Sequence, residues 1–317
     1  MSVASARVRR LSAALVVLLA AAAAAWLASR TGRAVPERRL LEADAAEVSR
    51  IEIRDRGASI VLERAAPGWV LLDGTLRLPA RAARVEALLA ELSARRRLDE
   101  AARTESARAR LGLAEGAARI LLLDSSGIPP LDLFVGDFGA DGASIFVARG
   151  GSPLSWSTDR SLAGYLDTER GRWLELGLGG GHAEAGDATL IEVDGELTLD
   201  PATQERFVAD YRLGRDPGGL WRFEGGEGSA PDQGRVDALV RMLLGLEADD
   251  IAGQADPGSF DPDLVLRLVT GGASREWRIR GIAGAFEIEA SDSPWRYRAG
   301  AARLRSVLST PEALLGR

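Results

Sequence analysis

The chain has 317 residues, of which 46% are hydrophobic and 27% are charged, and its net charge is −6. These values fit a globular protein of about two domains, and they give no overall basic surface for nucleic acid. Cys is absent, His occurs once, and all 40 residues of the Lys+Arg total are Arg. The chain therefore lacks a phosphate-binding lysine, a Schiff-base lysine, a thiol nucleophile, a disulfide and a multi-histidine metal site.

The N-terminal residues predict a membrane anchor. Arginines at positions 7, 9 and 10 precede an apolar run from Leu11 to Ala28, which only Ser12 interrupts. A helix of this length rises about 27 Å, close to the thickness of the hydrocarbon layer of a bilayer. We therefore expect a cytoplasmic tail at residues 1–10, a transmembrane helix at 11–29 and a stalk at 30–46.

A cleaved signal peptide is the alternative interpretation of this segment. The run of small residues Ala23-Ala24-Ala25 resembles a cleavage site, but the bulky Trp26 follows it and the apolar run continues. We expect an uncleaved anchor with its N-terminus inside, because no second candidate span follows. Either interpretation exports the body, which in a Gram-negative cell places it in the periplasm, anchored or secreted. Without Cys, a lipoprotein anchor is excluded.

The sequence after residue 46 predicts an α+β fold of antiparallel β-meanders with packed helices. Alternating apolar residues favour strands at 51–53, 60–62 and 69–72. A helix is expected over 84–98, because its apolar residues recur with the helical period. Short strands next to one another with Gly in the turns are typical of antiparallel sheets that carry helices on one face.

The same pattern occurs twice in the chain. Arg84-Val-Glu-Ala-Leu-Leu89 returns as Arg235-Val-Asp-Ala-Leu-Val240, and Pro67-Gly-Trp69 has a counterpart that ends at Trp221. We therefore expect two tandem halves, 47–176 and 189–317, joined by a Gly-rich segment at 177–188. In the second half, strands at 190–193 and 197–199 are expected before an insertion that contains Phe207 and Tyr211.

The matched apolar residues of the two halves are the expected core. Large aromatic side chains at corresponding positions are more typical of cores than of ligand-stacking sites. The expected core residues are Trp69, Trp221, Trp156, Trp295, Leu88 and Leu239.

These motifs together resemble a known family. An anchor, a "GW" strand, a Pro before "RVEALLAEL", and "LGL" followed by "RILLLD", "LFVG" and "IFVAR" are similar to the domain of unknown function 4340 family (DUF4340). The resemblance covers most of residues 46–317. It implies a membrane-anchored, extracytoplasmic protein associated with gliding-type ABC transporter systems, and it supplies no catalytic motif. The segments Leu111–Gly116 and Ser259–Asp263 depart from the usual Gly-Leu-Asp-Pro-like entry of the family.

Few residues suggest a catalytic, cofactor-binding or metal-binding role. His182 follows a glycine run that is typical of a linker, and Asp137-Phe-Gly139 is expected to be a turn. The aspartates between 249 and 263 lack the spacing of a calcium-binding loop and are expected in a solvated loop. No catalytic, cofactor-binding or metal-binding residue is nominated, and no cofactor is expected.

Arg95, Arg96 and Arg97 are the candidate partner surface. They end the first predicted helix, and Arg103, Arg108 and Arg110 follow. Cations suit the C-terminus of a helix, so a simple solvated face explains them as well. As a surface, they would face anionic lipid head groups or an acidic membrane partner.

The predicted function is a non-enzymatic, membrane-anchored periplasmic accessory or scaffold subunit of a gliding-type ABC transport complex. Its partners would be the inner membrane, through residues 11–29, and the permease or ATPase subunits, with no nucleic acid. The link to a transporter comes from the family resemblance alone. Two alternatives remain, an extracytoplasmic module that binds a glycan or small ligand, and an envelope hydrolase that uses carboxylates.

Overall fold

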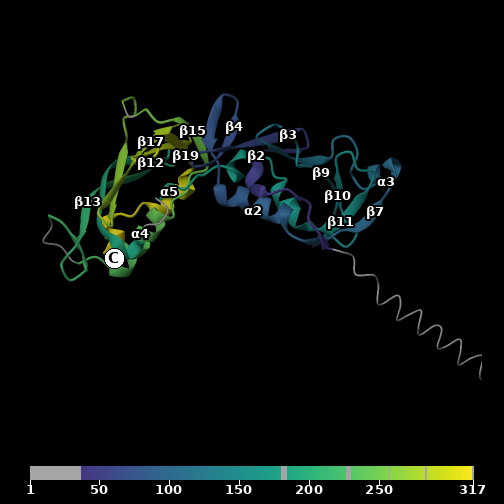
Figure 1. Ribbon diagram of the computed structural model, residues 1–317. Coiled ribbons are helices and arrows are strands. Elements are labelled where there is room, and N and C mark those ends of the chain that lie inside the picture. Colours follow the sequence, from purple (N-terminus) through teal and green to yellow (C-terminus); the bar gives the residue numbers. More distant parts are fainter. Residues whose placement is uncertain (1–36, 180–183, 226–229, 257, 283, 316–317) are drawn as a thin grey trace, which may run out of the picture. The chain divides into compact units, whose positions relative to one another are not determined.

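The computed structural model describes residues 37–179, 184–225, 230–256, 258–282 and 284–315 (Figure 1). Within these ranges the chain is mostly antiparallel β-sheet with a few helices, which confirms the α+β class. The expected anchor at 11–29 and His182 lie outside the described residues. In the part of the chain that is described, none of the helices has the length and apolar character needed to cross a bilayer.

The first large sheet has nine strands in the order β5-β4-β3-β2-β8-β9-β10-β11-β7. Period-two alternation forms it: in β8, Ile120 and Leu122 are buried on one face while Leu121 between them is half-buried. The strands are β2 (Val48–Asp55), β3 (Ala58–Ala65), β4 (Gly68–Asp73), β5 (Leu76–Pro79), β7 (Asp99–Ala102), β8 (Ala118–Asp124), β9 (Leu131–Phe138), β10 (Ser144–Arg149) and β11 (Ser155–Asp159).

The second large sheet has eight strands in the order β14-β13-β12-β16-β17-β18-β19-β15. Its longest strand, β12, pairs with β13 on one side and with β16 on the other. The strands are β12 (Ala188–Asp200), β13 (Glu205–Arg215), β14 (Trp221–Phe223), β15 (Asp250–Gln254), β16 (Leu264–Thr270), β17 (Ala273–Ile282), β18 (Ala285–Ala290) and β19 (Trp295–Ala299).

The longer helices are amphipathic and bury one face. Leu88 of α2 and Leu239 of α4 are buried, as is Leu304 of α5. Asp232 begins α4 by accepting a hydrogen bond of 3.1 Å from the backbone N–H of Arg235. The helices are α2 (Ala82–Ser93), α3 (Glu105–Ala109), α4 (Gln233–Leu244), α5 (Ala301–Val307) and α6 (Pro311–Leu314), with 3-10 turns η1 (Ala45–Glu47), η2 (Arg160–Tyr165), η3 (Arg170–Arg172) and η4 (Ala185–Asp187).

Contacts divide the described chain into two compact units. The first comprises residues 37–48, 54–57 and 88–166, and the second comprises 49–53, 58–87 and the described residues from 167 onward. This division by contacts is distinct from the expected sequence halves, which stay a prediction.

The first helix is shorter than expected, and the predicted stalk is partly folded. The helix ends at Ser93, and β6 (Arg96–Arg97) pairs with β1 (Glu37–Arg38) in a small two-stranded sheet. Leu40 and Leu41 are each 1% exposed. The N–H of Leu41 donates to the carbonyl of Leu92 at 2.8 Å. Residues 37–46 are therefore part of the folded body, because two large apolar side chains are buried there.

The start of the second sheet also differs from the expectation. Residues 190–193 and 197–199 belong to one strand, β12, and the expected insertion is its hairpin partner β13. Gly195, between the two expected strands, lies inside β12 with a φ of +130°. A Cβ at Gly195 would lie 2.2 Å from the carbonyl oxygen of Asp263. The glycine therefore allows a close approach of the backbone beside β16 instead of ending the strand.

Replacing Gly195 by Ala is expected to destabilise the protein by about 2 kcal/mol, because the new methyl group would collide with backbone and the φ is strained. The shift of the urea unfolding midpoint measures this. Gly253→Ala is the matched control, since Gly253 lies in β15 of the same sheet and a Cβ there would meet nothing within 4 Å. Equal urea midpoints for Gly195→Ala and Gly253→Ala would contradict the close backbone approach at Gly195.

Candidate functional site

The three arginines of the candidate partner surface do not share one environment. Arg95 and Arg97 are exposed, whereas the Arg96 side chain is only 4% exposed. Arg97 forms a surface ion pair with Asp99 at 2.8 Å. Arg96 therefore has to be removed from the expected surface, because in β6 neighbouring side chains point to opposite faces.

Arg96 joins three segments of the first unit through charged hydrogen bonds. Its guanidinium lies 2.7 Å from the carboxylate of Glu91 in α2 and 3.5 Å from that of Asp159 at the end of β11. It also donates to the Ser161 hydroxyl at 3.3 Å and to the backbone carbonyl of Glu91. A buried guanidinium needs such partners, because an unpaired charge in the interior is costly.

The carboxylates of this cluster are held ionised. The hydrogen bond from Ser161 is the main cause that lowers the pKa of Glu91, and bonding to Arg96 and its charge lower it further against the effect of burial. Burial acts to raise the pKa of Asp159, but hydrogen bonds from Ser161 and the charge of Arg96 lower it overall. Both carboxylates are therefore held in the charged form that pairs with Arg96.

The other arginines of the same stretch line a pocket in the first unit. Arg103 and Arg108 contribute to a cavity of about 640 Å³ beside α3, together with Phe134 and Ser152. Arg108 donates to the carbonyl of Ser152 at 2.9 Å, while its buried Nε has no partner within the described chain. Further lining residues are Glu105, Ala109, Leu113, Ala114, Glu115, Gly151 and Pro153.

This pocket combines charge of both signs with an aromatic side chain. Arg103 and Arg108 line it together with Glu105 and Glu115. The lining residue Phe134 is covered by Arg119, which lies 5.3 Å from the ring centre and is not itself a lining residue. The volume is in the range of small-molecule sites, and the guanidinium groups suit a carboxylate or phosphate. The lining residues supply guanidinium groups, the carboxylates of Glu105 and Glu115 and the Ser152 hydroxyl, and they contain no imidazole, thiol or lysine.

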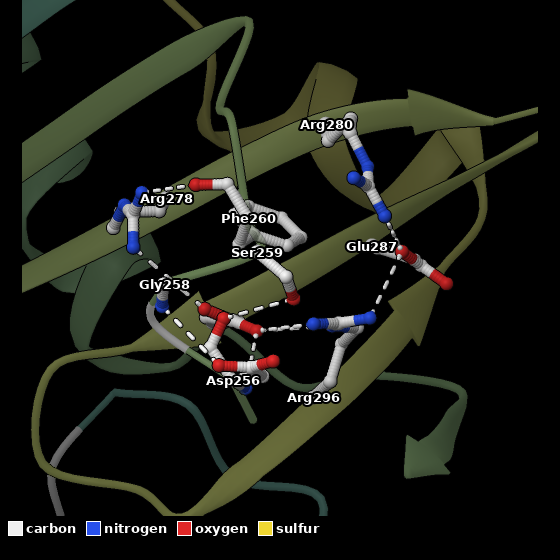
Figure 2. A network of polar contacts seen from close by, with 9 residues as sticks. Asp256, Gly258, Ser259, Phe260, Arg278, Arg280, Glu287 and Arg296 are labelled. Atoms are coloured by element: carbon white, nitrogen blue, oxygen red, sulfur yellow. Dashed lines mark hydrogen bonds and ion pairs between the residues drawn. The ribbon is translucent and has the colours of Figure 1, made fainter. Parts of the chain in front are cut away.

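A denser polar network lies in the second unit (Figure 2). Phe260, which is 3% exposed, is covered by three guanidinium groups, with Arg278 at 5.5 Å, Arg280 at 4.7 Å and Arg296 at 5.1 Å from the ring centre. Figure 2 shows Arg280 and Arg296 directed toward Glu287, at 2.6 and 3.9 Å. Cations over an aromatic face are attracted by its quadrupole.

The most buried carboxylate of the network is Glu289. Its side chain is 5% exposed and lies 2.9 Å from Arg296 and 3.8 Å from Arg278. The backbone N–H of Asp256 donates to it at 3.3 Å. These partners compensate the charge of Glu289, and the network links β17, β18 and β19 with the loop that carries Phe260.

The sequence interpretation missed this network, although a signal was present. The strands β17 and β18 place Arg278 opposite Glu289 and Arg280 opposite Glu287. Alternating arginines on one strand and glutamates on the next thus indicate a cross-strand ladder of opposite charges. Phe260 had no such signal, because a single aromatic residue in a loop does not reveal what covers it.

The expected core tryptophans occupy two environments. Trp69 is 5% exposed and Trp221 is 1% exposed, and the Trp221 indole donates to Asp237 at 2.9 Å. Trp156 and Trp295 are half-buried. The sequence interpretation missed Trp173 and Trp277, which are fully buried. Their indoles donate to the carbonyls of Asp167 at 2.7 Å and Leu178 at 2.9 Å.

The aspartates between 249 and 263 are dispersed rather than gathered. Asp249 pairs with Arg303 at 2.6 Å, Asp250 with Arg170 at 2.7 Å, and Asp263 accepts from the N–H of Gly281 at 2.7 Å. Residues 250–254 form strand β15 instead of a loop. Over the described ranges, no group of three or more acidic, His or Cys side chains could hold a metal ion.

Two of the motifs that carry the family resemblance lie in contact. The carbonyl of Leu111, in the "LGL" motif, accepts from the N–H of Asp137 at 2.9 Å. A Cβ at Gly136, which ends "LFVG", would lie 2.1 Å from that carbonyl oxygen. The glycine is therefore required for the loop before β8 to approach β9.

Comparison with known proteins agrees with this resemblance. The family described as "Domain of unknown function (DUF4340)" matches residues 69–263, more than half of the chain. The chain belongs to this family. No curated protein and no solved structure matches the chain. The DUF4340 match includes Gly112, Gly136 and Glu91, whereas Glu287, Glu289 and Arg296 lie beyond its C-terminal limit.

Arg96→Gln is expected to destabilise the protein by about 2 kcal/mol, because it leaves Glu91 and Asp159 without their shared cation. Arg95→Gln and Arg97→Gln are matched controls at exposed positions, where changes stay within about 0.5 kcal/mol. Urea unfolding midpoints of the three variants measure the difference. A change at Arg96 no larger than at its neighbours would show that the cluster carries no stability.

Proposed function

We propose that this DUF4340 protein is a non-enzymatic, membrane-anchored accessory subunit whose body binds other proteins in the periplasm. The observation that carries the proposal is the chemistry of its charged groups. The most buried carboxylate, Glu289, and the half-buried Glu91 are both neutralised by arginine. Catalysis by carboxylates needs one of them to be available as an acid or base near neutral pH, and this pairing opposes it.

The anchor is proposed from the apolar run at 11–29, with the N-terminus inside and the body outside. The folded position of Leu40 and Leu41 supports a short connection between such an anchor and the body. We further propose an ABC-type permease–ATPase complex as the partner, as the family resemblance implies. The absence of Lys supports a complex in which a partner subunit binds ATP, because this chain has no lysine to bind the phosphates of ATP.

We also propose that the body arose by tandem duplication of one α+β unit. The order of strands supports it: β4-β3-β2-β8-β9-β10-β11-β7 in one sheet parallels β14-β13-β12-β16-β17-β18-β19-β15 in the other. The helices α2 and α4 occupy corresponding places in the chain, each between the early strands and the edge strand β7 or β15. Two copies of one unit would provide two related binding surfaces.

The alternative function, binding of a small ligand, is favoured by one observation. The pocket beside α3 has about 640 Å³ and contains Arg103 and Arg108 with Phe134. An anionic ligand with an apolar or aromatic part fits this lining. The hydrolase alternative has no comparable support.

The topology can be tested by site-specific labelling, because the chain has no Cys of its own. We expect Ser125→Cys, at an exposed position before β9, to react with a membrane-impermeant maleimide when only the outer membrane is opened. Ser2→Cys should react only after the inner membrane is also opened. Labelling of Ser125→Cys only after inner-membrane lysis, or a mature chain without its first 25 residues, would contradict the proposed anchor.

The partner can be tested by copurification of the full chain in mild detergent. We expect permease or ATPase subunits with the wild-type chain and at least about tenfold less with the double variant Arg95→Gln/Arg97→Gln. Arg222→Gln/Arg298→Gln removes two exposed arginines of the second unit and serves as the charge-matched control. Absence of transporter subunits from the wild-type sample would refute the accessory role, and equal recovery with both double variants would refute the surface.

A further inference from the structure

The outer edge of β13 is largely uncovered by other strands. β13 spans Glu205–Arg215, but β14 pairs only with residues 213–215. On its other side β13 pairs with β12 along nearly its whole length. Over the described chain, residues 206–211 have no strand beside their outer edge, and such an edge is a template for pairing with another chain.

The hydrogen-bonding groups of alternate residues point out of this edge. The N–H of Glu224, which continues β14, donates to the carbonyl of Arg212 at 2.8 Å, so the backbone of Arg212 faces outward. The N–H of Glu196, opposite Val208 on β12, donates to Asp263 and so points away from β13. In antiparallel pairing these directions alternate, so the backbone groups of Arg206, Val208 and Asp210 also face outward.

The side chains of the same residues form an exposed stripe. Arg206, Val208 and Asp210 are all exposed, and Val208 is 60% exposed. Phe207, Ala209 and Tyr211 between them are buried. The stripe thus reads cation, apolar residue, anion along one face of an open edge. Arg206 already lies 2.7 Å from Glu196 of β12, opposite Val208, so it would contact a partner's carboxylate in addition to this one.

The anionic end of the stripe lacks a cation. Asp210 lies directly opposite Asp194 on β12. Neither carboxylate forms an ion pair with another described residue, and like charges opposite each other destabilise a strand pair. A cation supplied from outside the edge would relieve this repulsion.

We propose that two copies of the chain associate by antiparallel pairing of their β13 edges, centred on Val208. In this register Arg206 of each copy lies opposite Asp210 of the other, and Val208 lies opposite its own counterpart. Each pair exchanges both of its outward backbone hydrogen bonds. The result is a two-fold symmetric interface in which the partner neutralises Asp210.

Other registers of the same edges fit worse. A shift toward the C-terminus that places Val208 opposite Asp210 also places Arg206 opposite Arg212, and a further shift places two Asp210 residues together. A shift toward the N-terminus places Arg206 opposite Val208 and removes both ion pairs. Complementary charges therefore select the register centred on Val208.

The proposal is tested by reversing the charges in the full chain in detergent. The mass of the protein part of each particle is measured by size-exclusion chromatography with light scattering. Wild-type chain should dimerise, and Arg206→Asp or Asp210→Arg alone should raise the dissociation constant about tenfold or more, because each creates like charges at both pairs. An equimolar mixture of the two variants should dimerise again, since their edges are complementary to each other.

Val208→Pro gives a second test that leaves the charges unchanged. The N–H of Val208 points outward, so proline removes no hydrogen bond to β12 but blocks the partner strand; Val208→Thr is the matched control and should dimerise. Urea midpoints near that of the wild type show that each variant is folded. A monomeric wild type, single variants that dimerise normally, or a mixture that stays monomeric would overturn the proposal. Association through the anchor would not respond to these substitutions.

Discussion

Neutralisation of charge by arginine is the interaction on which this structure depends. The chain has no Lys and one His, so almost every cation that balances a buried carboxylate is a guanidinium. Arg96 bonds to two carboxylates, a hydroxyl and a carbonyl at once, and Arg170 binds Asp73, Asp250 and the carbonyl of Ile251. A planar group with five donors can join several segments, which an ammonium group at the end of a flexible chain does less well.

This use of arginine also bears on function. Guanidinium groups whose partners lie within the fold do not by themselves indicate a binding surface. Arg96 and the arginines around Phe260 are examples. Arg97 and Arg103 also form ion pairs, with Asp99 and Glu100, but their side chains remain accessible to solvent. Among the features that partners could reach in the described residues are Arg95 and Arg97, the pocket, and the edge of β13. Each of the three is a proposed place of association.

Much of the fold could be predicted from the sequence, because period-two alternation is strong in β8, β9, β10 and β16–β18. The failures have physical causes. Residues 190–193 and 197–199 were expected as two strands, but they form one strand through Gly195, where the close approach of Asp263 requires a glycine. The short strands β6, β7 and β15 were missed because charged and small residues there carry no alternation. The sequence does not show that Arg96 is buried while Arg95 and Arg97 are exposed. Its burial depends on Glu91 in α2 and on Asp159, which is distant in sequence.

The reliance on guanidinium groups has a consequence for tolerance to alkali. An arginine does not lose its proton in proteins, and the paired carboxylates are already ionised at neutral pH. Lysines, whose deprotonation ordinarily weakens ion pairs at high pH, are absent. The ion pairs of the described body therefore keep their charge from neutral to strongly alkaline solution, and their response to pH is one-sided, beginning only where acid protonates the carboxylates.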